Sequence, residues 1–172
     1  MQKRKELGRM IDEGIPGLYI CGAYQFLGKY YKEADGTIIN SLGILDLYTE
    51  NPGVGFSRLI GNIAVELLSG KRIVGFENHG GRTYLGEKIK PFGKVVKGYG
   101  NNGKDKTEGA IYKNSFGTYL HGPILPKNPE FADFLIKLAL EKKYGSPISL
   151  SPLDDSLEQQ ANKKIADRIL SD

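Results

Sequence analysis

The residues of this 172-residue chain best suited to nucleophilic chemistry are its single cysteine and its two histidines. Cys21 ends an apolar run over residues 17–21 and precedes a helical pattern, so it is predicted to lie in a sharp turn between a strand and a helix. Helix amides and the helix dipole favour a thiolate there, and Gly22 is expected to let the backbone turn tightly behind the sulfur. The alternative for Cys21 is a small buried hydrophobic side chain.

His121 is the candidate base for this thiol. It follows a strand-like run over residues 115–120, and the carboxyl ends of strands in an open α/β sheet share one edge. We therefore expect Cys21 and His121 to meet at that edge. Such a pair supports acyl transfer, in which the imidazole takes the thiol proton and later protonates a leaving amine. Without the pairing, His121 would be a histidine held by loop backbone atoms.

His79 is a second candidate for the base, because it also follows an apolar strand, over residues 72–77. Glu77 lies two positions earlier and would share its strand face, so both residues are candidates for a common pocket. A metal site built from Cys21, His79 and His121 is disfavoured, because zinc sites usually take two ligands from one short spacing. We therefore expect no metal.

The elements that must position these residues alternate between strands and helices. Apolar spacing predicts a helix over residues 3–12 and a second one over residues 24–31. A third helix is predicted to begin at Pro129, with Asn128 as its N-cap, and to end at Gly145. A final helix is expected from about residue 155. The predicted strands span residues 17–21, 36–40, 43–48, 58–67, 72–77, 94–97, 109–112 and 115–120.

Composition indicates one folded, soluble domain over residues 1–172, with 40% hydrophobic and 26% charged residues. Apolar runs are shorter than the ~20 residues that cross a bilayer, and the first residues do not resemble a signal peptide, so we expect a cytoplasmic protein. The net charge is +4. Its densest basic region, residues 88–113, is interrupted by acidic residues and glycines, which argues against a nucleic-acid partner.

Three segments resemble the signatures of a known family, in its order. They are Ile-Cys-Gly-Ala-Tyr-Gln over residues 20–25, Gly-Phe-Glu-Asn-His-Gly-Gly-Arg-Thr over 75–83, and Gly-Thr-Tyr-Leu-His-Gly over 117–122. The chain is similar here to cobyric-acid-synthase-like class I glutamine amidotransferases, and especially to the glutaminase subunits of lipid II isoglutaminyl synthases. The resemblance covers residues 17–144 and implies an α/β, flavodoxin-like fold.

The resemblance implies roles for individual residues. Cys21 would attack the side-chain amide of L-glutamine, and His121 would act as general base and then acid. Gly22 would offer its backbone N–H to the oxyanion. Arg58 falls where this branch places an arginine for the substrate, and a guanidinium can bind an α-carboxylate through two hydrogen bonds. The alternative for Arg58 is a solvent-facing residue at a strand start.

The same resemblance implies a partner. The ammonia would pass to a Mur-ligase-like synthetase subunit in a heterodimer, which amidates the α-carboxyl of D-glutamate in lipid II to D-isoglutamine during peptidoglycan synthesis. ATP and Mg²⁺ would bind that partner, and the chain itself has no Walker-type phosphate loop. The alternatives are an amidotransferase for another acceptor, such as cobyric or cobyrinic acid, and a non-catalytic subunit.

The sequence also departs from the family pattern. Many class I amidotransferases carry a carboxylate two residues after the histidine, where this chain has Pro123. A Cys-His dyad with another orienting group is therefore expected. Ala23 stands where the family commonly has glycine. Family members carry a strand–helix region and a glycine-rich oxyanion loop before the nucleophile strand, so we expect an amino-terminally incomplete domain, which motivates the non-catalytic alternative.

Overall fold

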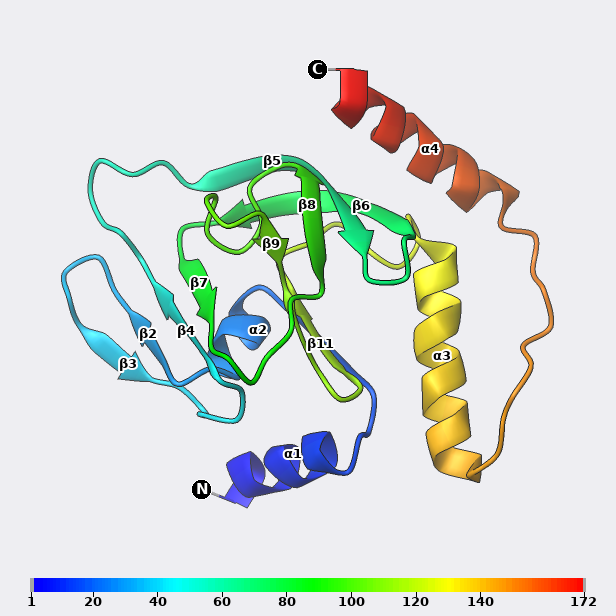
Figure 1. Cartoon of the computed structure of the whole chain (residues 1–172), viewed down its shortest axis with the longest axis horizontal. Helices are drawn as coiled ribbons and strands as arrows, with labels where there is room; N and C mark the ends of the chain where they lie inside the picture. Colours follow the sequence, from blue (N-terminus) through cyan, green and yellow to red (C-terminus); the bar gives the residue numbers. More distant parts are fainter. Residues whose placement is uncertain (1, 172) are drawn as a thin grey trace.

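The computed structural model describes residues 2–171, which form a mixed α/β arrangement of helices around three sheets (Figure 1). The helices are α1 (Gln2–Asp12), α2 (Gly22–Phe26), α3 (Pro129–Tyr144) and α4 (Ser156–Ser171). The first six strands are β1 (Gly17–Ile20), β2 (Tyr30–Lys32), β3 (Ile38–Asn40), β4 (Leu47–Glu50), β5 (Leu59–Leu67) and β6 (Arg72–His79). The last five are β7 (Arg82–Leu85), β8 (Gly93–Lys97), β9 (Thr107–Glu108), β10 (Ala110–Tyr112) and β11 (Ser115–Thr118).

The sheet that positions the predicted site has the order β1-β11-β10. β1 and β11 run parallel, with Gly17 opposite Ser115 and Ile20 opposite Thr118. This pairing brings residues 21 and 119–121, which follow the two strands, to the same edge. The close approach of α2 requires a glycine on β11, because a Cβ at Gly117 would collide with the ring of Tyr24.

The other two sheets have the orders β3-β2-β4-β7 and β6-β5-β8-β9. The predicted α/β class is confirmed. Within residues 2–171, however, parallel strand pairs are confined to β1–β11 and β2–β4, whereas a flavodoxin-like sheet is mainly parallel. An antiparallel bridge between Phe76 and His121 joins β6 to the segment after β11. β6 therefore reaches the same edge as Cys21 from a different sheet.

The helix predicted over residues 24–31 is wrong in its second half. α2 ends at Phe26, and Tyr30 and Tyr31 lie in β2. The chain leaves the helix because Lys29 N–H donates to the carbonyl of Leu47, 2.8 Å away, which starts the pairing with β4. Residues 82–85, which the sequence pattern assigned to no helix or strand, form β7 against β4.

The third predicted helix is confirmed as α3, with Pro129 first and Gly145 in a left-handed conformation after it. The capping role predicted for the Asn128 side chain is wrong. Its amide instead accepts from the N–H of Val74 at 2.9 Å and donates to the carbonyl of Val74 at 2.8 Å. Asn162 of α4 donates to the same side chain at 3.0 Å. Asn128 therefore ties both carboxyl-terminal helices to β6.

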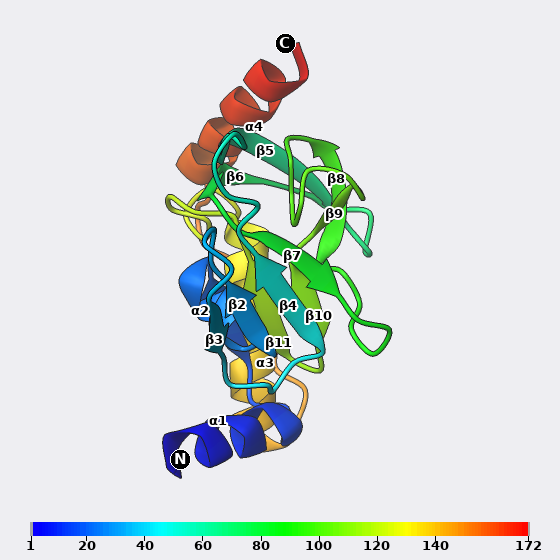
Figure 2. The same cartoon turned by 90° about the vertical axis from the view of Figure 1, so that its left-hand side faces the viewer.

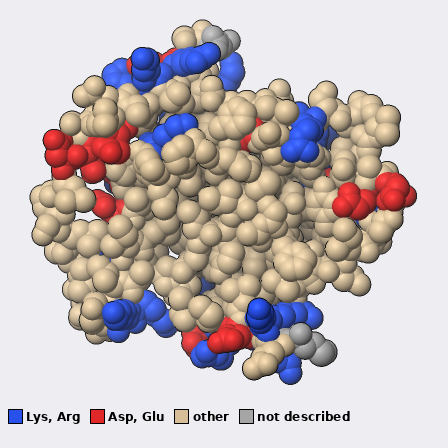
Figure 3. Space-filling model, turned by 180° about the vertical axis from the view of Figure 1, so that it is seen from behind, with Lys and Arg blue, Asp and Glu red and all other residues tan. Residues whose placement is uncertain are grey.

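The next features are the position of α3 and α4 and the distribution of charge on one face of the molecule. Two views show α3 and α4 packed along one side of the sheets (Figures 1 and 2). Seen from behind, charged side chains of both signs gather near the periphery and the middle of the face is largely uncharged (Figure 3). Among residues 2–171, no helix is both long and apolar enough to cross a bilayer.

Glu108 is a carboxyl group buried between β9 and β11. One oxygen accepts from Thr118 Oγ1 at 2.7 Å and from the N–H of Tyr119 at 2.8 Å. The other oxygen has no hydrogen-bond partner among the described residues. Burial accordingly raises the pKa of Glu108 from 4.5 to about 7. The folded protein thus holds a proton that the unfolded chain releases.

Glu108→Gln should therefore flatten the dependence of stability on pH. Because the folded-state pKa is the higher one, the stability that Glu108 contributes should fall as pH rises from 4.5 to about 7 and then level off. The amide resembles the protonated acid, so the variant should lose less stability between pH 5 and 8, by about 2–3 kcal/mol. Denaturant unfolding at the two pH values measures this. Glu66→Gln, at an exposed carboxyl, should keep the wild-type dependence.

Candidate active site

Cys21 occupies a sharp turn between β1 and α2, as predicted. Its N–H donates to the carbonyl of Thr118 on β11 at 2.9 Å, and its carbonyl accepts from the N–H of Gln25 at 2.9 Å. Between these two bonds Cys21 adopts φ 52° and ψ −109°, a region that residues other than glycine rarely occupy. This strained strand-to-helix turn is the conformation in which α/β enzymes present a nucleophile.

The positive φ of this turn lies at Cys21 and not at Gly22, which is the first residue of α2. Apart from the two chain neighbours and the backbone of α2, a Cβ added to Gly22 would meet no described atom within 4 Å. The backbone strain of the turn is therefore carried by Cys21 itself.

The thiol of Cys21 is partly buried, and its surroundings act on its pKa in opposite directions. Burial raises the pKa, while the N–H of Gly22 and the positive charge of Arg58 lower it. Burial prevails, so the resting group is the neutral thiol and needs a base to become a nucleophile. The amide that lowers the pKa is the one predicted to receive the oxyanion.

His121 lies at the same sheet edge, three residues after β11. Its backbone N–H donates to the carbonyl of Phe76 at 2.7 Å, and its ring Nδ1 lies 3.2 Å from the same oxygen. In the tautomer that donates from Nδ1, Nε2 carries the lone pair and is able to accept a proton. The backbone of Phe76 thus holds the ring where Pro123 replaces the usual carboxylate, and sequence reasoning left this orienting group unnamed.

Arg58 has an exposed side chain that is nevertheless anchored. Its Nε donates to Asn78 Oδ1 at 3.0 Å and its Nη2 donates to the carbonyl of Asn78 at 3.1 Å. Arg82 steadies the neighbouring loops by donating to the carbonyls of Ser57 and Gly80 at 2.7 and 2.8 Å. The positive charge of Arg58 lowers the pKa of the Cys21 thiol, so the two groups interact electrostatically. Sequence reasoning missed Asn78 and Arg82, although both belong to the second signature segment.

Glu77 and His79 share a face of β6, as predicted, but they lie inside the protein and not on an open pocket. His79 is 2% exposed and Glu77 is fully buried. The ring Nδ1 of His79 donates to the carbonyl of Gly81 at 2.8 Å, and its Nε2 faces Glu77 Oε2 at 3.6 Å. Glu77 also accepts the N–H groups of Tyr99 and Gly100 at 2.7 and 2.9 Å. His79 is therefore a poor candidate for the base of an exposed reaction.

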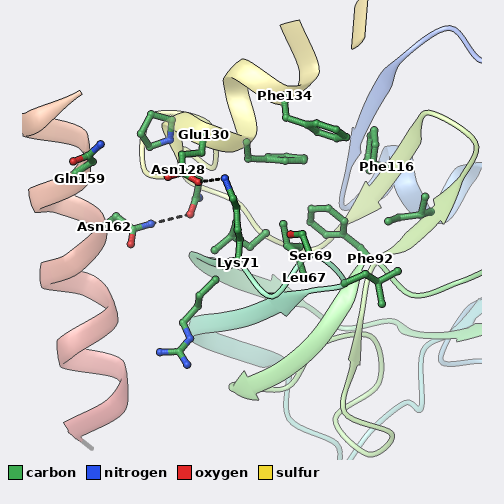
Figure 4. Close-up of a pocket in the computed structure, with 16 residues that line it drawn as sticks. Leu67, Ser69, Lys71, Phe92, Phe116, Asn128, Glu130, Phe134, Gln159 and Asn162 are labelled. Atoms are coloured by element: carbon green, nitrogen blue, oxygen red, sulfur yellow. Dashed lines mark hydrogen bonds and ion pairs between the residues drawn. The ribbon is translucent and has the colours of Figure 1, made fainter. Parts of the chain in front are cut away.

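A cavity of about 590 Å³ lies elsewhere, between α3, α4 and the turn that joins β5 to β6 (Figure 4). Its lining includes Phe92, Phe116 and Phe134, and none of the predicted site residues contributes to it. In residues 2–171, no group of three or more His, Cys, Asp or Glu side chains is placed to hold a metal ion.

Cys21 follows β1 and His121 follows its parallel neighbour β11, an arrangement that could support cysteine-dependent acyl transfer in an α/β protein. A crystal structure of a glutamine amidotransferase has the same fold, with a TM-score of 0.58 over 79% of this chain and 67% of that one, at 16% identity. The sequence matches the CobB/CobQ-like glutamine amidotransferase domain over residues 1–129, and the chain belongs to that family.

Curated relatives carry more specific names. The chain is 52% identical over 162 residues to the lipid II isoglutaminyl synthase (glutamine-hydrolyzing) subunit GatD of Staphylococcus aureus, covering 94% of this chain and 64% of that protein. Identity to the Streptococcus pneumoniae subunit is 42%, covering 96% and 63%. A probable cobyric acid synthase of Methanothermobacter thermautotrophicus is 33% identical, covering 86% and 31%. The chain thus spans a little under two thirds of the GatD proteins.

The strain at Cys21 predicts an order of stability among variants that lack the thiol. Cys21→Gly should be more stable than Cys21→Ala by about 1 kcal/mol, because glycine adopts positive φ without a steric penalty. Ala23→Gly, two positions later inside α2, should instead destabilise by about 0.5–1 kcal/mol. Denaturant unfolding of the three variants measures these differences. Equal stability of the two Cys21 variants would show that the elbow is unstrained.

The charge of Arg58 predicts a shift in thiol reactivity. Arg58 lowers the pKa of Cys21, so Arg58→Gln should move the pH profile of iodoacetamide alkylation to higher pH, by about a few tenths of a unit to one unit. Arg58→Lys should move it less. Arg72→Gln, at an exposed arginine that lines the distant cavity, should keep the wild-type profile. An unshifted Arg58→Gln profile would remove the electrostatic link.

Proposed function

We propose that this protein is a glutaminase that hydrolyses the side-chain amide of L-glutamine and passes the ammonia to a synthetase partner. The observation that carries the proposal is the strained elbow at Cys21 after β1, together with His121 after the parallel neighbour β11, whose ring Nδ1 lies 3.2 Å from the carbonyl of Phe76. Membership of the glutamine amidotransferase family supports glutamine as the substrate.

The first half-reaction forms a thioester. His121 Nε2 takes the thiol proton, and the sulfur of Cys21 bonds to the amide carbon of glutamine. The negative charge that develops on the amide oxygen is stabilised by the N–H of Gly22. The carbon–nitrogen bond then breaks as His121 returns the proton to the leaving nitrogen, which departs as ammonia.

The second half-reaction releases glutamate. His121 takes a proton from water, and the water oxygen attacks the thioester carbon. The carbon–sulfur bond breaks, and Cys21 recovers its proton from the imidazolium. One glutamine and one water thus give one glutamate and one ammonia, and the enzyme is regenerated.

Arg58 is proposed to bind the α-carboxylate of glutamine. Asn78 holds its Nε and Nη2, which leaves Nη1 and the remaining N–H of Nη2 as donors for a substrate carboxylate. A guanidinium fixed by two hydrogen bonds loses little rotamer freedom when the substrate binds. Its positive charge also favours the thiolate of Cys21.

The proposed acceptor is lipid II, on the basis of the GatD relatives at 52% and 42% identity. The partner would be a Mur-ligase-like subunit that activates the D-glutamate α-carboxyl with ATP and Mg²⁺, in a heterodimer with this chain. Cobyric acid synthases, at 33% identity, make a corrinoid carboxylate the second candidate acceptor. A free nucleophilic thiol is best preserved in a reducing compartment, which favours the cytoplasm.

The test is ammonia release from L-glutamine by the full-length protein, with and without the partner. Wild type should release ammonia, Cys21→Ala should release none above background, and His121→Ala should be slower by about 10²–10⁴-fold. Ala23→Ser, at an exposed position beside the elbow, serves as the folded control.

The outcomes separate the alternatives. Ammonia release that survives Cys21→Ala would overturn the cysteine mechanism. A folded wild-type complex that releases none would identify a non-catalytic subunit. Amidation of a corrinoid carboxylate, but not of lipid II, would replace the proposed acceptor while leaving the glutaminase step intact.

A further inference from the structure

The three signature segments meet at one buried side chain, that of Tyr119. This residue is fully buried on the third segment. Its hydroxyl accepts a hydrogen bond from Gln25 Nε2, on the first segment, at 2.9 Å. It also lies 2.6 Å from Thr83 Oγ1, at the end of the second segment. None of these three side chains has a part in the reaction steps above.

The hydrogen bonds form a continuous chain. The amide nitrogen of Gln25 can only donate, so the Tyr119 hydroxyl accepts from it and has its single proton left for Thr83. Thr83 Oγ1 in turn lies 2.8 Å from Thr49 Oγ1, and the two hydroxyls share a hydrogen bond. Each hydroxyl in this buried row is therefore satisfied, which stabilises one arrangement of the four side chains.

The ring and backbone of Tyr119 are held as firmly as its hydroxyl. Its ring stacks on His79, with centroids 3.5 Å apart and planes 4° from parallel. Tyr24 packs against it edge-on at 5.3 Å. Its N–H donates to Glu108 at 2.8 Å. The buried Glu77–His79 pair thus has a structural use, because it supports the ring of Tyr119.

The backbone of Tyr119 is connected to both proposed reacting groups. The residue before it, Thr118, accepts the N–H of Cys21, and His121 follows two residues later. Gln25, which binds the hydroxyl, donates its own N–H to the carbonyl of Cys21. A displacement of Tyr119 relative to Gln25 would therefore move His121 relative to the thiol.

We propose that Tyr119 and Gln25 are positioning residues that set the distance between the thiol of Cys21 and the imidazole of His121. They act through the backbone of α2 and of the segment after β11, without contacting the substrate. The inference rests on the proposed glutaminase function, since that function makes the thiol–imidazole distance matter. Small misplacements of reacting groups lower rates steeply.

The test compares Tyr119→Phe with wild type in the full-length protein, together with its partner. Loss of the hydroxyl should lower kcat about tenfold to a hundredfold and leave KM within about twofold, because the substrate contacts remain. The rate of Cys21 alkylation by iodoacetamide at neutral pH should also fall toward that of His121→Ala. Gln25→Leu, which removes the donor and leaves the ring in place, should give the same changes.

Two controls distinguish positioning from general stability. Tyr24→Phe removes an equally buried hydroxyl, bonded to Asn101 Oδ1 at 3.0 Å, and should keep the wild-type kcat and alkylation rate. The double variant of Tyr119→Phe and Gln25→Leu should be no slower than either single variant, because both changes break the same hydrogen bond.

Three results would overturn the inference: a Tyr119→Phe protein with wild-type kcat and alkylation, an equal loss in Tyr24→Phe, or fully additive losses in the double variant. The alkylation measurement does not depend on turnover. A wild-type protein that releases no ammonia would therefore overturn the proposed function, while the alkylation rates would still decide whether Tyr119 positions the thiol and the imidazole.

Discussion

The parallel ladder between β1 and β11 is the interaction on which the rest of the site depends. It continues past the end of β1 through the hydrogen bond from Cys21 N–H to Thr118, and Cys21 adopts its positive φ as the chain turns from this bond into α2. Gly117 allows the ring of Tyr24 to lie directly on β11. Because the ladder sets the register of both strands, it also decides which residue beyond β11 faces the thiol edge.

The site is surrounded by buried polar groups, which is unusual for a protein interior. Glu77 is satisfied by the backbone N–H groups of Tyr99 and Gly100, whereas Glu108 keeps one oxygen unpaired and is held near neutrality by its raised pKa. Unpaired buried charge is costly, so these groups are stable only in one arrangement of the surrounding loops. Burying these groups costs stability, and their hydrogen bonds hold the surrounding loops in one geometry.

The electrostatics of the thiol explain why geometry matters so much here. Burial raises the pKa of Cys21 more than Gly22 and Arg58 lower it, so the protein does not keep a permanent thiolate. In the proposed mechanism, nucleophilicity then depends on the distance between the thiol and the imidazole of His121. That imidazole is oriented by a backbone carbonyl, that of Phe76, and not by a side-chain carboxylate. Such a site is sensitive to anything that moves β6 or the segment after β11.

The candidate nucleophile and base, the strands that precede them, most of the helices and strands, and the family can be predicted from the sequence, because apolar periodicity and short motifs are local properties of the chain. The strand-to-helix turn at Cys21 was predicted in the same way. The folded protein was needed to show that α2 stops at Phe26, that His79 is buried against Tyr119, and that Gln25 reaches a hydroxyl 94 residues away. These features depend on contacts between distant segments, and no local pattern records which side chains the folded sheets bring together.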